Sequence, residues 1–149
     1  MKITIINLQN RVPVNSRKVA KIAQKVLSSE GIKKSGEITI CFVNDQKIKE
    51  LNLRYLAKNN PTDVIAFDVA EPKRPDKLFA DIVISTDRAI DNADVFKTSP
   101  LFELYLYVIH GVLHILGYDD RRKADKLLMR KKEQALLKSL NLSPATYNL

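Results

Sequence analysis

The stretch that decides the fold is LFELYLYVIHGVLHILGYDD, residues 101–120, in which apolar side chains fill nearly every position up to Leu116. Ser99 and Pro100 precede it, and serine is a common helix N-cap while proline suits the first helical position. Gly117 follows as a natural helix end. A helix that is apolar on almost every side is buried. The sequence therefore predicts a central, buried helix ending before Gly117.

Upstream of this helix, the spacing of apolar residues predicts strand, helix, strand, helix and two more strands. The expected segments are a strand over Lys2–Leu8, a helix from Asn15 to Gly31, a strand over Glu37–Val43, a helix from Asn44 to a break at Asn59–Pro61, and strands over Asp63–Val69 and Phe79–Ser85. The short gap between the last two strands predicts an antiparallel hairpin. Its proline-containing segment, Glu71–Lys77, is expected to be an exposed loop.

Two further helices are expected, a short one over Arg88–Val95 and a last one over Arg121–Leu140. The last helix is amphipathic, with lysine and arginine outward and an expected inward face of Ala124, Leu127, Leu128, Ala135 and Leu136. This order predicts an α+β fold: a single small mixed β-sheet of about four strands packed against about five helices. The length of 149 residues suits one domain spanning residues 1–149.

Charge gives the first hint of function. Lysine and arginine number 25 against 17 acidic residues, a formal net charge of +8. Such a surplus favours polyanionic partners such as nucleic acid, although a lysine-rich soluble surface gives the same count. The single Cys41 fits a reducing compartment. The N-terminal segment lacks a signal-peptide core, and the one long apolar run contains Glu103 and two histidines. We therefore expect a cytoplasmic protein that does not enter the membrane.

The two histidines of the chain, His110 and His114, both lie in the central helix. Because they are four residues apart, they project from the same face of the helix and together can bind one divalent ion. Two unpaired imidazoles in a core would each cost about 1–3 kcal/mol, and a shared metal removes that cost. The alternative is that both rings are simply hydrogen-bonded core or surface residues.

A third ligand is expected from the turn after the helix. Gly117 lets the chain reverse, so that a carboxylate of Tyr118-Asp119-Asp120 can return toward the imidazoles. Two histidines and one carboxylate leave a position for water, as in catalytic zinc sites. Zinc lowers the pKa of that water to about 7, which makes a nucleophile available at neutral pH. Either aspartate has the alternative role of capping the last helix.

Together these residues resemble a known family. HGVLHILGYDD, residues 110–120, is similar to the YbeY signature His-Gly-any-Leu-His-apolar-any-Gly-Tyr-any-His and departs from it at Asp120. Further likeness comes from Leu51-Asn52, Tyr55, Lys58, Pro61-Thr62-Asp63-Val64-Ile65-Ala66-Phe67 and Ala80-Asp81-Ile82-Val83-Ile84-Ser85. The resemblance implies a single-strand-specific endoribonuclease in ribosomal RNA maturation and ribosome quality control, working with the small ribosomal subunit. It also implies one Zn²⁺ per chain, held by His110, His114 and Asp120.

The departures from the family bear on substrate binding. Leu56 stands where the family usually has an arginine that is associated with RNA, so Arg54 or Lys58 is the expected substitute. Ala66 and Ala80 replace a usual serine and glycine. Asp81 is retained and is a candidate general base, with capping or pairing near the sheet edge as its alternative.

Two other functions fit the sequence. One is a non-catalytic ribosome assembly factor with a structural metal, and the other is a metal-dependent hydrolase of another substrate, such as a peptide. Gly111 counts against a peptidase, because zinc proteases place a glutamate base directly after the first histidine. The basic residues Arg130, Lys131 and Lys132 of the last helix contact RNA or form a solvated face.

Overall fold

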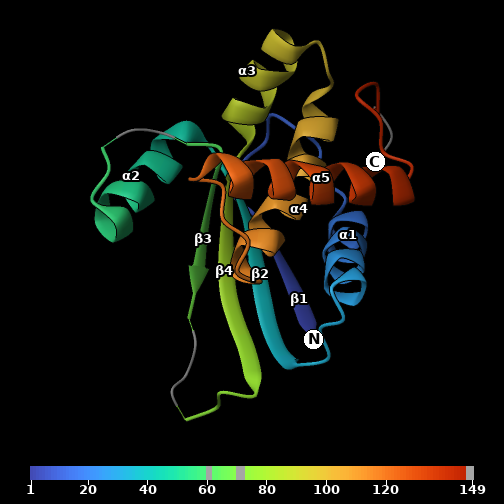
Figure 1. The fold of residues 1–149 in the computed structure, drawn as a ribbon. Helices are drawn as coiled ribbons and strands as arrows, with labels where there is room; N and C mark the ends of the chain where they lie inside the picture. The colour runs from blue at the N-terminus through green and yellow to red at the C-terminus, as the bar shows by residue number, and fades with distance from the viewer. Residues whose placement is uncertain (60–61, 70–72, 147–149) are drawn as a thin grey trace.

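The computed structural model describes residues 1–59, 62–69 and 73–146, and its elements follow the predicted order (Figure 1). They are β1 (Lys2–Asn7), α1 (Ser16–Ser29), β2 (Ser35–Val43), α2 (Asp45–Leu56), β3 (Val64–Asp68), β4 (Lys77–Ser85), α3 (Thr86–Phe96), α4 (Pro100–Ile115) and α5 (Lys123–Ser139). The predicted α+β class is confirmed. Asn60 and Pro61 of the expected helix break, and Glu71 and Pro72 of the expected loop, lie outside the described residues.

The sheet is mixed and has the strand order β1-β2-β4-β3. β1, β2 and β4 run parallel, while β3 pairs antiparallel with β4, which confirms the predicted hairpin. Side chains alternate between the two faces of a strand. One face carries Ile38, Ile40 and Phe42 and packs with α1 and α4 into the main core. The other face packs with α2 into a smaller cluster around Ile48 and Val83.

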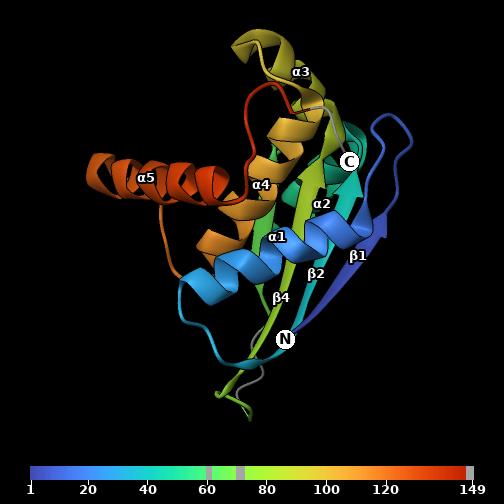
Figure 2. The same cartoon turned by 90° about the vertical axis from the view of Figure 1, so that its right-hand side faces the viewer.

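α4 lies between the sheet and α5 (Figure 2). Most of its side chains are buried, as predicted, and the buried set includes Glu103. Gly111 lies directly against the sheet. A Cβ atom there would stand 2.7 Å from Cγ2 of Ile82 and 3.3 Å from Cγ1 of Val64. The glycine therefore allows the α4 backbone to approach the sheet more closely than any side chain would permit.

Helix caps explain where most helices begin. The Asn15 side chain accepts from the Lys18 amide at 3.1 Å and Asn44 accepts from the Lys47 amide at 2.9 Å, as the sequence indicated. α3 begins two residues before its predicted start. The reason is Ser85, which ends β4 and whose hydroxyl accepts from the Arg88 amide at 3.2 Å.

The predicted inward face of the last helix is confirmed at Leu136 and wrong at its other four positions, which are exposed: Ala124, Leu127, Leu128 and Ala135. Leu127 and Leu128 are 69% and 47% exposed, whereas Met129 and Leu136 are 1% and 6% exposed. α5 packs mainly against one neighbour, α4, so that it buries one narrow stripe. The remaining apolar side chains of α5 stay in contact with solvent. No helix in the described ranges combines the length and the apolar character that a membrane span requires.

The close contact at Gly111 predicts that Gly111→Ala destabilises the fold. The added methyl group would press on Ile82 and Val64, and overpacking of this kind costs about 1–3 kcal/mol. The measurement is the free energy of unfolding from urea titration. As a control, Ile82→Ala removes the obstructing group, so the double variant should lose less stability than the sum of the single variants. Strict additivity would contradict the contact.

Candidate metal centre

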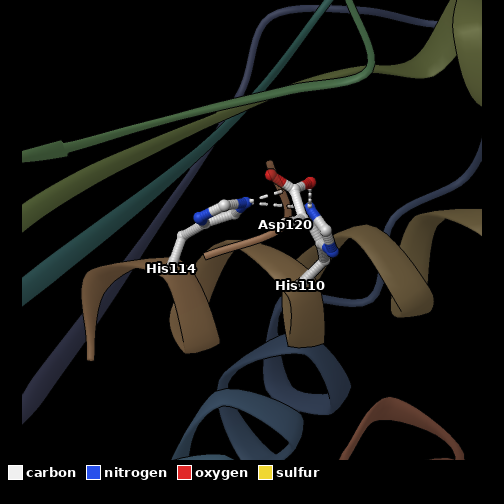
Figure 3. A group of neighbouring side chains, drawn as sticks. All are labelled: His110, His114 and Asp120. Carbon is white, nitrogen blue, oxygen red and sulfur yellow. Dashed lines mark hydrogen bonds and ion pairs between the residues drawn. The ribbon is translucent and has the colours of Figure 1, made fainter. Parts of the chain in front are cut away.

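The two histidine side chains meet on one side of α4 (Figure 3). Their Nε2 atoms are 3.0 Å apart, and the rings stand edge to face with centroids 4.6 Å apart. The side chains are 24% and 29% exposed, so each ring is held by packing while one edge remains open. This is the shared face that the spacing of His110 and His114 predicted.

The turn after α4 brings Asp120 to the histidines. Gly117 adopts a φ of 101°, which reverses the chain. Asp120 Oδ2 then lies 3.3 Å from Nε2 of His110 and 3.5 Å from Nε2 of His114. The structure thus brings together the three side chains that the sequence analysis selected as ligands.

Asp119 makes different contacts from Asp120. Its Oδ1 accepts from the Asp120 amide at 2.7 Å and the Arg121 amide at 3.2 Å, and its carboxylate pairs with the Arg121 guanidinium. The bond from Arg121, together with the two amides, lowers the pKa of Asp119 to about 2. Asp119 therefore shapes the turn, and neither aspartate is the N-cap of α5. That position is taken by Arg122, whose side chain makes no capping hydrogen bond. Asp120 is left with its carboxylate directed at the histidines.

The three side chains fit a divalent ion. Two imidazole nitrogens and one carboxylate oxygen form a donor set of the catalytic zinc type. Donors bound at about 2.0–2.2 Å in a tetrahedral arrangement lie roughly 3.3–3.6 Å from one another. The three separations here are 3.0, 3.3 and 3.5 Å. His110, His114 and Asp120 thus form a cluster that can hold one metal ion.

Negative charge surrounds this cluster. Burial by itself would lower the pKa of His110, but a hydrogen bond from its ring to Glu133 and the charges of Glu133, Asp120 and Asp63 raise that pKa. Positive charge is therefore favoured at His110 despite its burial. A bound cation would be stabilised by the same carboxylates.

The loop that carries Asp120 is anchored to α1. The Tyr118 hydroxyl donates to Glu30, and Lys132 Nζ lies 3.0 Å from the other oxygen of that carboxylate and 5.5 Å from the centroid of the Tyr118 ring. The Tyr118 bond, assisted by Lys132, lowers the pKa of Glu30 although burial opposes the shift. Lys132 is thus engaged within the protein, unlike its exposed neighbour Lys131.

A cavity of about 400 Å³ opens beside His110 and Asp120 between α3, α4 and α5. Its lining contains four carboxylates and two cations: Asp63, Glu103, Asp120 and Glu133, with Lys126 and Arg130. Burial raises the pKa of Glu103 against the opposing effect of a hydrogen bond from Thr98.

Neither Asp63 nor Glu133 was among the site residues predicted from the sequence. The signal available for Asp63 was its place in residues 61–67, a segment that resembles the family. Glu133 had a weaker one, since it stands with Asp125 as one of two acidic residues in a basic helix.

Other expected site residues lie elsewhere. Arg54 on α2 and Lys58 just after it are exposed, and neither lines the cavity beside the histidines. Asp81 is exposed on β4 between Ala80 and Ile82, whose side chains face the main core. Because side chains alternate along a strand, Asp81 faces the opposite side of the sheet from α4. It is not placed to act as a base at the cluster.

The Tyr118 anchor predicts a pH-dependent loss of stability in Tyr118→Phe. The native pKa of Glu30 is lowered below 4.5, so its stabilising contribution is present above pH 4.5 and fades as pH falls through the native pKa. We expect the variant to lose about 1–3 kcal/mol at pH 7, and less in acid, because a hydrogen bond to a charged acceptor is lost. Urea unfolding at several pH values measures the difference, and a pH-independent difference would contradict this role.

Comparison with known proteins agrees with the resemblance seen in the sequence. A sequence model described as "Endoribonuclease YbeY" matches residues 4–141. Proteins named endoribonuclease YbeY are 38% identical in Syntrophus aciditrophicus, over 99% of this chain and 94% of that protein, and 45% identical in Flavobacterium psychrophilum, over 76% and 78%. A solution structure of a Thermotoga maritima protein shares the fold, with a TM-score of 0.60 and 23% identity over 93% of this chain and 91% of that one. The chain therefore belongs to the endoribonuclease YbeY family.

Proposed function

We propose that this chain is a single-strand-specific, metal-dependent endoribonuclease that matures ribosomal RNA in the cytoplasm and works with the small ribosomal subunit. Family membership supports internal cleavage of RNA, and the resemblance supports the ribosomal substrate and partner. The observation that carries the metal dependence is the convergence of His110, His114 and Asp120 beside a cavity. We propose one Zn²⁺ per chain at these ligands, within a single domain formed by residues 1–149.

Different groups at the cluster would supply the Lewis acid and the proton acceptor for RNA cleavage. A zinc ion at such a site acts as a Lewis acid and lowers the pKa of a water molecule. Asp63 shares the cavity with His110 and Asp120, so its carboxylate is the group that we expect to accept a proton during attack on the phosphodiester. Gly111 offers no base and instead packs against the sheet, which separates this site from the zinc-protease arrangement.

Positive charge for the RNA backbone comes from α5. Lys126 and Arg130 line the cavity next to the cluster, where a scissile phosphate would lie. Lys131 is also exposed but faces a separate surface hollow with Leu127 and Leu128. Arg54 and Lys58, which the resemblance suggested for substrate binding, lie outside the cavity. That they contact RNA stays a prediction.

The first test is cleavage of labelled single-stranded RNA with and without a chelator. We expect one zinc per purified chain and cleavage that the chelator abolishes, because the ion supplies the Lewis acid. His114→Ala should lose both zinc and cleavage. Asp120→His should keep both, since imidazole is an equally suitable ligand, whereas Asp120→Ala should lose them.

Cleavage that survives in His114→Ala would contradict the metal-dependent mechanism. Zinc binding without any cleavage would favour the assembly-factor function, and sedimentation with small ribosomal subunits would then test the partner separately.

A second test measures how RNA affinity depends on salt. Each phosphate contact to a single strand contributes about 0.7 to the slope of log affinity against log salt concentration. Lys126→Ala and Arg130→Ala should each weaken binding and reduce the slope by about that amount. Lys131→Ala is the matched control on the same helix and should change the slope little. Arg54→Ala and Lys58→Ala test the remaining substrate-binding prediction, and equal effects of all five variants would indicate diffuse attraction.

A further inference from the structure

The two ring nitrogens of His110 have different neighbours. Its Nε2 faces His114 and Asp120, at 3.0 and 3.3 Å. Its Nδ1 faces away from the cluster and lies 3.4 Å from Oε1 of Glu133 on α5. Among the described residues, no carboxylate lies within hydrogen-bond distance of Nδ1 of His114. Both histidines therefore present Nε2 to the candidate ion site, but among the described residues only His110 has a carboxylate beside its Nδ1.

The fold holds Glu133 in this place. Its side chain is 13% exposed, far less than those of most charged residues on α5. Met129 and Leu136, four residues before and three residues after it, are buried and fix which face of α5 meets α4. Lys132 ties the same helix to Glu30. Glu133 is thus held against α4 by packing on both sides.

A carboxylate at Nδ1 decides which nitrogen of a neutral imidazole carries the proton. The carboxylate accepts a hydrogen bond, so the proton stays on Nδ1 and the lone pair of Nε2 is left free for an ion. Such a contact also fixes the plane of the ring and makes the ligand more basic.

We propose that Glu133 is a positioning residue that holds His110 in the Nδ1–H tautomer and so prepares it to bind the metal. This inference rests on the proposed metal site and adds a residue from α5 to it. In the part of the chain that the structure describes, no carboxylate supports His114 in this way, so that histidine serves as an internal comparison.

The experiment uses imidazole nitrogen NMR on the full-length, metal-free protein. The chain contains two histidines, and the spectrum of a His114→Ala variant identifies which signals belong to His110. Because the Asp120 carboxylate lies 3.3 Å from Nε2 and competes for the proton when no ion is bound, the comparison is made in an Asp120→Ala background. At alkaline pH, this protein with Glu133 intact should show His110 as the Nδ1–H tautomer. Glu133→Ala should shift His110 toward the Nε2–H tautomer and leave His114 unchanged. Glu133→Gln keeps an oxygen acceptor and should largely restore the spectrum seen with Glu133 intact.

Competition with a zinc-binding dye supplies the second readout. Loss of a carboxylate behind a ligating histidine weakens metal affinity by about 10- to 100-fold. We expect that loss in Glu133→Ala and a smaller one in Glu133→Gln. Asp125→Asn removes the same charge from the same helix without touching His110 and should leave zinc affinity near wild type.

An unchanged tautomer and an unchanged zinc affinity in Glu133→Ala would overturn the inference. Equal losses of affinity in Glu133→Ala and Asp125→Asn would also overturn it, because the effect would then be one of net charge. Both readouts are independent of RNA. If the tautomer and the zinc affinity change as expected but the protein does not cut RNA, the proposed nuclease activity would be contradicted and the role of Glu133 would not.

Discussion

The arrangement of the candidate metal centre depends on the contact between Gly111 and the sheet. A missing side chain lets α4 lie directly on Ile82 and Val64, which fixes the rotation of the helix about its axis. With residue 111 facing the sheet, residues 110 and 114 project from the flank of the helix, adjacent to each other. The histidines therefore point out of the main core, toward α5 and the loop that carries Asp120.

Around that fixed helix, the other groups of the site arrive from separate parts of the chain. The loop that carries Asp120 is shaped by Asp119 and tied to Glu30 through Tyr118. α5 brings Glu133 behind His110 and adds two cations at the cavity. Carboxylates gather around His110, whereas the net charge of the chain is positive. This separation suits a cation held at the centre and a polyanion held around it.

Much of the fold followed from short-range patterns in the sequence. Caps such as Asn15 and Asn44, the alternation of Ile38, Ile40 and Phe42, and the apolar run of α4 each act through neighbouring residues, so they are visible without a structure. The three candidate ligands could be selected from the sequence because they lie within eleven residues of one another. Most of the inward face of α5 and the place of Asp81 were misjudged, since both depend on which distant element packs against them. Glu133 could not be found for the same reason, because only the packing of α5 on α4 brings it to His110.

The outer position of α5 has a consequence for the dynamics of the molecule. This helix packs mainly on α4, so its hydrogen bonds are expected to open before those of the sheet. Opening would withdraw Glu133 from His110 and release the chain that follows Asp120. An ion that binds only the closed form reduces the fraction of molecules with α5 open by the factor 1 + [L]/Kd, where [L] is the free ion concentration and Kd its dissociation constant. Occupancy of the centre would then set how long the amide protons of α5 resist exchange with water, which makes this helix a natural reporter of metal loading.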